Sequence, residues 1–200
     1  QQTHTNKILH DYKNMLTTLQ LSLSKASTKQ SSDTQEIINQ AQTSLNKTEI
    51  NSSVLNSIKS VPLKSLIYLK WTEAANKRID MIIQVNGHIP TLKNDTGLSV
   101  IRALGILIDN AIDETSKIHG KQFEVLVQIG KDNNLELTVA NHVAKDFKLN
   151  YLNGSGFTTK GDNHGQGMAI INDLVKKYHE LNIRKKLIKN RLEITLYVKG

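Results

Sequence analysis

Hydrophobic residues near the N-terminus recur at alternating intervals of three and four positions. The residues with this spacing are Leu9, Tyr12, Leu16, Leu19 and Leu23. Such a heptad pattern is typical of a helix that packs against another helix. A polar run over residues 24–33 interrupts the pattern. A second helical stretch then continues to about Val61, with Leu55 and Ile58 on its apolar face. We therefore expect a helical hairpin over residues 1–61.

Two antiparallel helices expose an apolar stripe on each side, so a lone hairpin would be poorly buried. Two copies of the hairpin can bury these stripes in a dimeric four-helix bundle. We therefore expect residues 1–61 to form a dimerisation domain, and the protein to be a homodimer.

The pattern changes after Pro62, where helical stretches alternate with short runs rich in β-branched residues. The expected helices cover residues 63–77, 98–118 and 167–178, and the expected strands cover residues 79–85, 123–129, 135–140 and 192–198. Lys189 and Asn190 should turn a terminal β-hairpin. Because strands and helices alternate without regular β-α-β spacing, we expect an α+β fold over residues 62–200. It should be an α/β sandwich with helices on one face of a mixed sheet.

The composition narrows the class of protein. Cysteine is absent, which excludes a disulfide framework and a thiolate metal site and suits a reducing compartment. No stretch approaches ~18 consecutive apolar residues, the length needed to span a bilayer, and the N-terminus lacks the pattern of a signal peptide. The chain begins with Gln1 in the middle of a pattern, so we expect it to be a fragment of a longer protein.

The formal net charge of +8 raises the question of nucleic-acid binding. Basic residues are spread along the chain, however, and the densest group lies in the expected terminal hairpin. That group is Arg184, Lys185, Lys186, Lys189 and Arg191. A solvated face, or proximity to an anionic membrane surface or a nucleotide, explains these residues as well. We expect no nucleic-acid partner.

The stretch L-G-I-L-I-D-N-A-I-D-E over residues 104–114 has the pattern of a buried helix interrupted by polar residues. Asn110 breaks the apolar face, with Asp109 before it and Asp113 one turn later. Its amide oxygen could bind a hard cation such as Mg²⁺, which prefers oxygen ligands and is usually shared with substrate phosphates. Alternatively, Asn110 could tie down a neighbouring loop.

A second candidate stretch, F-T-T-K-G-D-N-H-G-Q-G-M-A-I over residues 157–170, runs into a predicted helix. Gly165 and Gly167 would leave backbone N–H groups bare at the positive end of that helix, which favours phosphate binding. Hydroxyls and a cation of the T-T-K segment precede them. The spacing is not that of a P-loop, and no strand comes directly before it, as a dinucleotide-binding fold requires.

Together the two stretches resemble the ATP-binding fold shared by gyrase, the Hsp-type chaperone ATPases, histidine kinases and the MutL repair proteins. The resemblance implies ATP and Mg²⁺ as cofactors, Asn110 as the magnesium ligand, and Gly165 and Gly167 as the second glycine box. The first glycine box is missing, and Asn141 stands where these proteins carry the aspartate that reaches the adenine amino group. An asparagine oxygen can still accept a hydrogen bond from that group.

Essentially the full chain is similar to the quorum-sensing peptide-receptor histidine kinases of Gram-positive bacteria, of the accessory gene regulator type. Three elements in order carry this resemblance: H-D-Y-K-N at residues 10–14, the Asn110 helix, and the T-K-G-x-x-x-G-x-G segment. It implies an upstream membrane sensor for a secreted peptide pheromone, a downstream response regulator, and a location at the cytoplasmic side of the cell membrane. The candidate nucleotide contacts are Asn110, Asp113, Asn141, Thr158, Thr159, Lys160, Gly161, His164, Gly165, Gly167 and Met168. His164 stands where arginine is usual, which implies a weaker or pH-dependent phosphate contact.

In this resemblance His10 is the phosphate acceptor. It flanks the heptad seam, so its imidazole should project into solvent, where it is a competent nucleophile for the γ-phosphorus of ATP. Asp11 should act as the general base or orient the ring; alternatively, it only pairs with Lys7. Asn14 lies one turn from His10 and should position a water that dephosphorylates the response regulator.

Two alternatives remain open. An anti-sigma-type serine kinase would bind ATP but need neither His10 nor the hairpin. A catalytically dead module would dimerise and bind a partner with a vestigial pocket. One residue favours phosphoryl transfer to a side chain over hydrolysis: Ile106 lies four residues before Asn110, where ATP-hydrolysing relatives carry a carboxylate.

Overall fold

The computed structural model describes residues 52–92, 94–152 and 166–200. The predicted hairpin lies outside the described residues apart from its last segment. The helices are α3 (Ser52–Asn56), α4 (Val61–Asn76), α5 (Asn94–Lys117) and α6 (Gln166–Lys177), with short 3-10 helices at Lys131–Asn133 and Leu149–Leu152. The strands are β1 (Asp80–Asn86), β2 (Gln122–Ile129), β3 (Leu135–His142), β4 (Leu181–Ile188) and β5 (Arg191–Val198). Within these ranges, no helix has both the length and the apolar character needed to cross a membrane.

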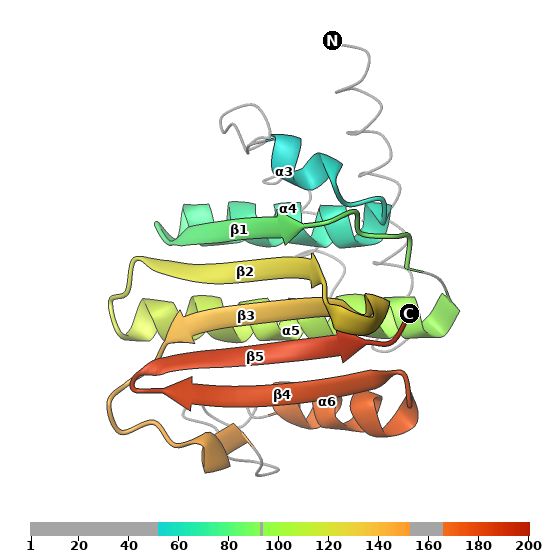
Figure 1. Cartoon of the computed structure of the whole chain (residues 1–200). Coiled ribbons are helices and arrows are strands. Elements are labelled where there is room, and N and C mark those ends of the chain that lie inside the picture. The colour runs from blue at the N-terminus through green and yellow to red at the C-terminus, as the bar shows by residue number, and fades with distance from the viewer. Residues whose placement is uncertain (1–51, 93, 153–165) are drawn as a thin grey trace, which may run out of the picture.

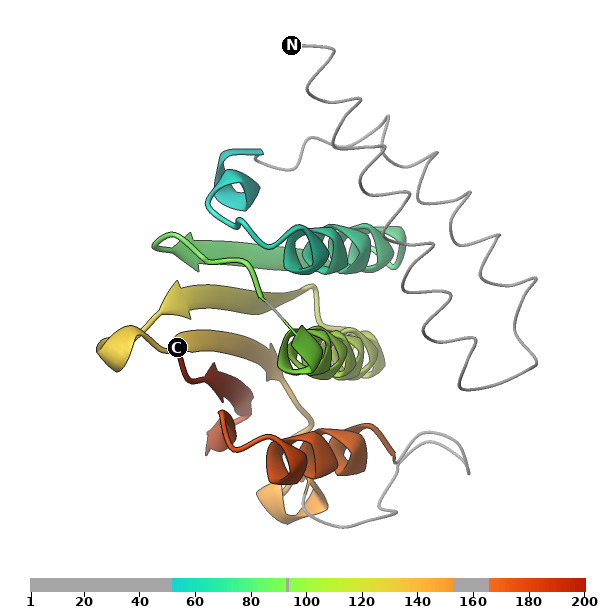
Figure 2. The same cartoon turned by 90° about the vertical axis from the view of Figure 1, so that its right-hand side faces the viewer.

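The strands form one mixed sheet in the order β1-β2-β3-β5-β4. β1 runs parallel to β2, and the other neighbouring strands are antiparallel (Figure 1). Figure 2 shows α4, α5 and α6 side by side on one face of this sheet, while no described element covers the opposite face. The predicted α+β sandwich, with helices on one face of a mixed sheet, is confirmed.

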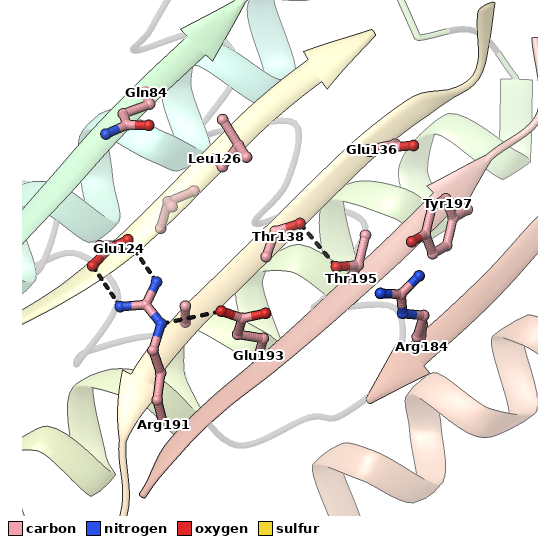
Figure 3. Close-up of a pocket in the computed structure, with 12 residues that line it drawn as sticks. Gln84, Glu124, Leu126, Glu136, Thr138, Arg184, Arg191, Glu193, Thr195 and Tyr197 are labelled. Atoms are coloured by element: carbon pink, nitrogen blue, oxygen red, sulfur yellow. Dashed lines mark hydrogen bonds and ion pairs between the residues drawn. The ribbon is translucent and has the colours of Figure 1, made fainter. Parts of the chain in front are cut away.

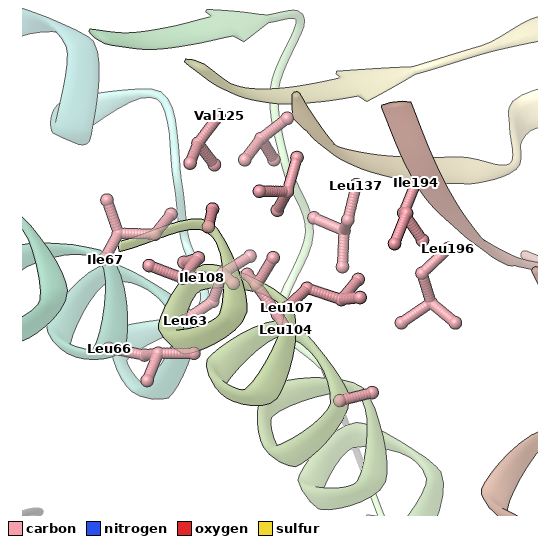
Figure 4. Packing of buried hydrophobic residues seen from close by; sticks show 14 of the residues in the cluster. Leu63, Leu66, Ile67, Leu104, Leu107, Ile108, Val125, Leu137, Ile194 and Leu196 are labelled. Atoms are coloured by element: carbon pink, nitrogen blue, oxygen red, sulfur yellow. The ribbon is translucent and has the colours of Figure 1, made fainter. Parts of the chain in front are cut away.

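The core between sheet and helices follows from the two-residue period of the strands. Alternate residues of β2, β3 and β5 face the helices and are buried, among them Val125, Leu137 and Leu196. Leu104 and Ile108 of α5 meet them from the other side, as Figure 4 shows. Burying one such side chain contributes roughly 1.5–3 kcal/mol. This packing fixes α5 against the centre of the sheet.

The segment before α4 differs from the prediction. α3 ends at Asn56, and Ile58 forms a parallel bridge with Ile89, so the expected helix through Ile58 is wrong. The physical reason is burial: Ile58 and Ile89 are both 0% exposed, and Leu55 joins the same core. Pro62 then occupies the first turn of α4, where its missing N–H leaves no hydrogen bond unmade.

The terminal hairpin forms as predicted, and Lys189 takes a left-handed backbone conformation in its turn (φ 54°). Arg191 donates hydrogen bonds to both carboxylate oxygens of Glu124, at 2.7 and 2.8 Å, and one to Glu193 at 3.1 Å. These bonds from Arg191 hold the pKa of Glu124 below its ordinary value. Part of the basic cluster is therefore neutralised within the sheet face, as expected for a solvated surface.

Candidate functional site

The polar residues of α5 point to two different neighbours. Asp109 forms an ion pair with Lys70 of α4, and Asp113 lies 3.7 Å from the Nζ atom of Lys77, also on α4. Asn110 instead lies on the side of α5 that meets α6. Successive residues of a helix are about 100° apart around its axis, so neighbours in the sequence can serve different contacts.

The first turn of α6 touches α5 at Asn110. A Cβ atom placed on Gly167 would lie 2.8 Å from Cγ2 of Ile106 and 3.7 Å from Nδ2 of Asn110. Only a residue without a side chain allows this approach. The structure thus brings together two residues that the sequence singled out in separate motifs. It also places the N-terminus of α6, whose first backbone N–H groups have no partner within the helix, beside the amide of Asn110.

Asn141 lies near the end of β3, on the face of the sheet that the helices cover. Its position follows from the strand period, because Leu137 and Val139 on the same face are buried. Asn141 is only 6% exposed, and its Nδ2 atom donates a hydrogen bond to the backbone oxygen of His142 at 2.8 Å. Figure 1 shows β3 and α5 running toward the same end of the sheet. Asn141 and the C-terminal half of α5 therefore lie at that end.

The other predicted site residues have their described contacts elsewhere or lie outside the described residues. Asp113 was expected among the nucleotide contacts, but its carboxylate lies toward Lys77. Met168 is half-buried and packs against the hydrophobic core. The remaining candidates lie outside the described residues: His10, Asp11, Asn14, Thr158, Thr159, Lys160, Gly161, His164 and Gly165.

A buried lysine beside this site was not singled out from the sequence. The side chain of Lys70 is 15% exposed, and its Nζ atom contacts Asp109 and lies 2.8 Å from Glu73. Burial alone would lower the pKa of Lys70, but the two carboxylates outweigh it and raise the pKa, so the ammonium stays charged. The sequence does hint at this buried lysine, because Lys70 stands within the apolar run L-I-Y-L-K-W.

A hollow of about 410 Å³ lies on the uncovered face of the sheet, away from the helices (Figure 3). Its polar groups largely bind one another: Arg191 pairs with Glu124, and the Thr138 and Thr195 hydroxyls are 2.9 Å apart. Among the residues that the structure describes, none of the predicted nucleotide contacts lines this hollow. The candidate site is therefore the contact between α5 and α6 at Asn110 and Gly167, together with the end of β3 that packs on α5, and not this hollow.

The sequence of this chain matches a known protein family. Residues 96–198, slightly more than half of the chain, match the family model described as GHKL domain. The sensor protein CitS of Bacillus subtilis (strain 168) is 25% identical over 126 residues, which make up 62% of this chain and 23% of CitS. The chain thus spans about a quarter of the length of that curated relative.

Comparison with solved structures gives the fold. The catalytic domain of histidine kinase ThkA matches with a TM-score of 0.57 at 16% identity, over 69% of this chain and 90% of that one. Full-length ShkA in complex with AMPPNP matches with a TM-score of 0.54 at 18% identity, over 68% of this chain and 29% of that one. A histidine kinase domain from Erythrobacter litoralis, of a blue-light activated kinase, covers 98% of this chain and 94% of its own at 9% identity, with a TM-score of 0.52.

The family model spans the three described residues that form the candidate site, Asn110, Asn141 and Gly167. The predicted resemblance to the fold of gyrase, chaperone ATPases, histidine kinases and MutL proteins is confirmed at the level of the family. The peptide-receptor subfamily stays a prediction. The match of residues 96–198, together with the shared fold, shows that the chain belongs to the GHKL domain family.

Proposed function

We propose that the chain is the kinase region of a two-component sensor histidine kinase. It would use Mg²⁺ and ATP to phosphorylate itself on His10 and then pass the phosphoryl group to an aspartate of a response regulator. The observation that carries this proposal is the contact between the first turn of α6 and α5, where Gly167 meets Asn110. A side chain suited to a hard cation and a helix end suited to phosphate adjoin there, which supports a nucleotide site.

Each described part of the site has a role in holding the nucleotide. The amide oxygen of Asn110 would bind Mg²⁺, and the first backbone N–H groups of α6 would bind phosphate oxygens. Nδ2 of Asn141 donates to the backbone of His142, and its amide oxygen would accept a hydrogen bond from the adenine amino group. A single protein ligand suits Mg²⁺, because this ion is usually shared with phosphates.

The remaining contacts would come from the segment before α6. The residues proposed there are Thr158, Thr159, Lys160, Gly161, His164 and Gly165. Their hydroxyls, backbone N–H groups and cation suit the β- and γ-phosphates. Met168 and Asp113 complete the proposed set, although the contacts of both lie elsewhere in the described residues: Met168 against the core, and Asp113 toward Lys77.

The proposed reaction is transfer of the γ-phosphoryl group of ATP to His10. A ring nitrogen of His10 would attack the γ-phosphorus, forming an N–P bond while the bond to the β-phosphate oxygen breaks and ADP leaves. Asp11 would hold the proton on the other ring nitrogen. Bound Mg²⁺ would stabilise the charge on the phosphate oxygens. Ile106 supports transfer over hydrolysis, because the residue that packs against Gly167 is a hydrocarbon and not a carboxylate base.

The proposed biological setting is peptide-pheromone quorum sensing. Residues 1–61 would form the homodimeric phosphotransfer hairpin, with Asn14 serving dephosphorylation of the regulator. A membrane sensor upstream would receive the peptide and place this region at the cytoplasmic side of the cell membrane. The name of the relative CitS, a sensor protein, supports a role in sensing; the peptide signal rests on the sequence resemblance alone.

Labelling with ATP tests the proposed function. The chain is incubated with γ-labelled ATP and Mg²⁺, and the labelled protein is treated with acid and, separately, with alkali. We expect label that acid removes and alkali spares, as for phosphohistidine, and no label in His10→Gln. His179→Gln, which removes an imidazole that is 91% exposed, should label normally. Acid-stable label would indicate a serine kinase, and absence of both label and nucleotide binding would indicate a dead module.

A further inference from the structure

We infer that Lys70 is a positioning residue for Asn110: through its ion pair with Asp109, it fixes the rotation of α5 that presents the Asn110 amide to the nucleotide site. This inference rests on the proposed function. It adds a residue of α4, which none of the sequence motifs contains, to the groups on which metal-dependent nucleotide binding depends.

The ammonium of Lys70 joins α4 to α5 through its ion pair with Asp109. Lys70 lies near the middle of α4, its side chain is 15% exposed, and its Nζ atom bridges Glu73 at 2.8 Å and Asp109. Glu73 lies on the same helix, one turn on, so that pair holds the ammonium in place without joining the helices. The contact with Asp109 joins α4 to α5. A charged group held in this way is costly to leave unpaired, so the pairing resists rotation of α5.

The position of Asp109 in α5 couples it to Asn110. It directly precedes Asn110, so the two side chains leave the helix about 100° apart. Asp109 meets α4, whereas Asn110 lies beside Gly167 of α6. A rotation of α5 that moved Asp109 away from Lys70 would move Asn110 along the surface of α6 by a similar angle. Holding one residue therefore holds the other.

No other described ion pair holds the rotation of α5 as well as the pair of Lys70 and Asp109. Lys77 also reaches α5, but its distance to Asp113 is 3.7 Å and its side chain is 44% exposed. Exposed pairs contribute little. Hydrophobic packing keeps α5 on the sheet, and the pair of Lys70 with Asp109 adds a buried attachment to α4 one residue away from Asn110. Lys70 is thus the group best placed to set the angle of Asn110.

The experiment compares nucleotide affinity with Mg²⁺ and with EDTA in the full chain. In Lys70→Met we expect the gain in ATP affinity that Mg²⁺ produces to fall about tenfold, as for residues that orient metal ligands. Affinity in EDTA should stay within about twofold of wild type, because Asn110 is proposed to act through the metal. Lys70→Arg, which keeps the charge, should recover much of the gain. Lys117→Met is the matched control, since it removes an ion pair with Glu114 within the last turn of α5 and leaves the pair between α4 and α5 intact.

Asp109→Asn is the second variant, because it removes the charge pairing with almost no change of shape and should give the same pattern even if Lys70→Met unfolds. Thermal unfolding of each variant shows that the protein is folded. A folded Asp109→Asn or Lys70→Met with the full Mg²⁺-dependent gain would overturn the positioning role, and so would an equal loss with Mg²⁺ and EDTA. Wild type that binds no nucleotide under either condition would overturn the proposed function itself, and the positioning role with it.

Discussion

Asn110→Ala should nearly abolish labelling of the chain by γ-labelled ATP in the presence of Mg²⁺. We expect the rate to fall by about 10²- to 10³-fold, because a correctly placed metal ion contributes several kcal/mol to such a reaction. The half-buried amide of Asn110 beside Gly167 is the described group best suited to place it. Asn110→Asp keeps an oxygen at the same position and should retain clearly more activity than Asn110→Ala.

The control for this prediction is Asn86→Ala. Asn86 is exposed on β1, and its amide is 3.5 Å from Gln128, away from the helices. This variant should label at the wild-type rate. If Asn110→Ala were labelled within a few-fold of wild type at saturating Mg²⁺, Asn110 would not be the metal ligand, and the alternative that it serves a structural contact would stand.

Gly167→Ala should weaken nucleotide binding about tenfold or more and lower the free energy of unfolding by roughly 1–3 kcal/mol, the usual cost of overpacking. The new methyl group would lie 2.8 Å from Cγ2 of Ile106. Because that atom belongs to a β-branched side chain with little freedom, we expect α6 to move away from Asn110. ATP titration by calorimetry and unfolding in urea measure the two effects.

Gly105→Ala is the matched control. It lies on α5, where an added Cβ would meet Leu66 at an ordinary distance of 3.5 Å, so it should bind ATP normally and unfold no more easily than wild type. Adding Ile106→Ala to Gly167→Ala removes the clashing methyl group and should restore part of the affinity. Wild-type affinity in Gly167→Ala alone would show that the approach of α6 to α5 does not matter for the site.

The sheet and its helices could be predicted because their burial follows simple periods. Strands such as β2 and β5 alternate buried and exposed residues, and this alternation is visible in the sequence. The turn at Lys189 and Asn190 was visible for a similar reason, since a polar pair separates two such strands. Asn110 was found because it interrupts the apolar face of a predicted helix, and Gly167 because a G-x-G pair runs into the start of the next one.

The contacts between helices and strands could not be predicted from the sequence. A period tells which face of a helix is buried, but not which neighbour each polar residue on its edge will meet. There was therefore no sign in the sequence that Lys70 pairs with Asp109, or that Asp113 lies close to Lys77. Ile58 was misread because its apolar spacing also fitted the preceding helix, while its partner Ile89 is far away in sequence.

Mapping the nucleotide site by NMR tests the central claim most directly. The isotope-labelled chain is titrated with Mg²⁺ and the unreactive analogue AMPPNP, and the backbone and side-chain amide signals are followed. Among the residues that the structure describes, we expect the largest shifts on Asn110, Asn141 and Gly167, while Thr138 and Thr195 on the uncovered sheet face hardly change. Shifts centred on those two threonines, or no shifts at millimolar nucleotide, would contradict it.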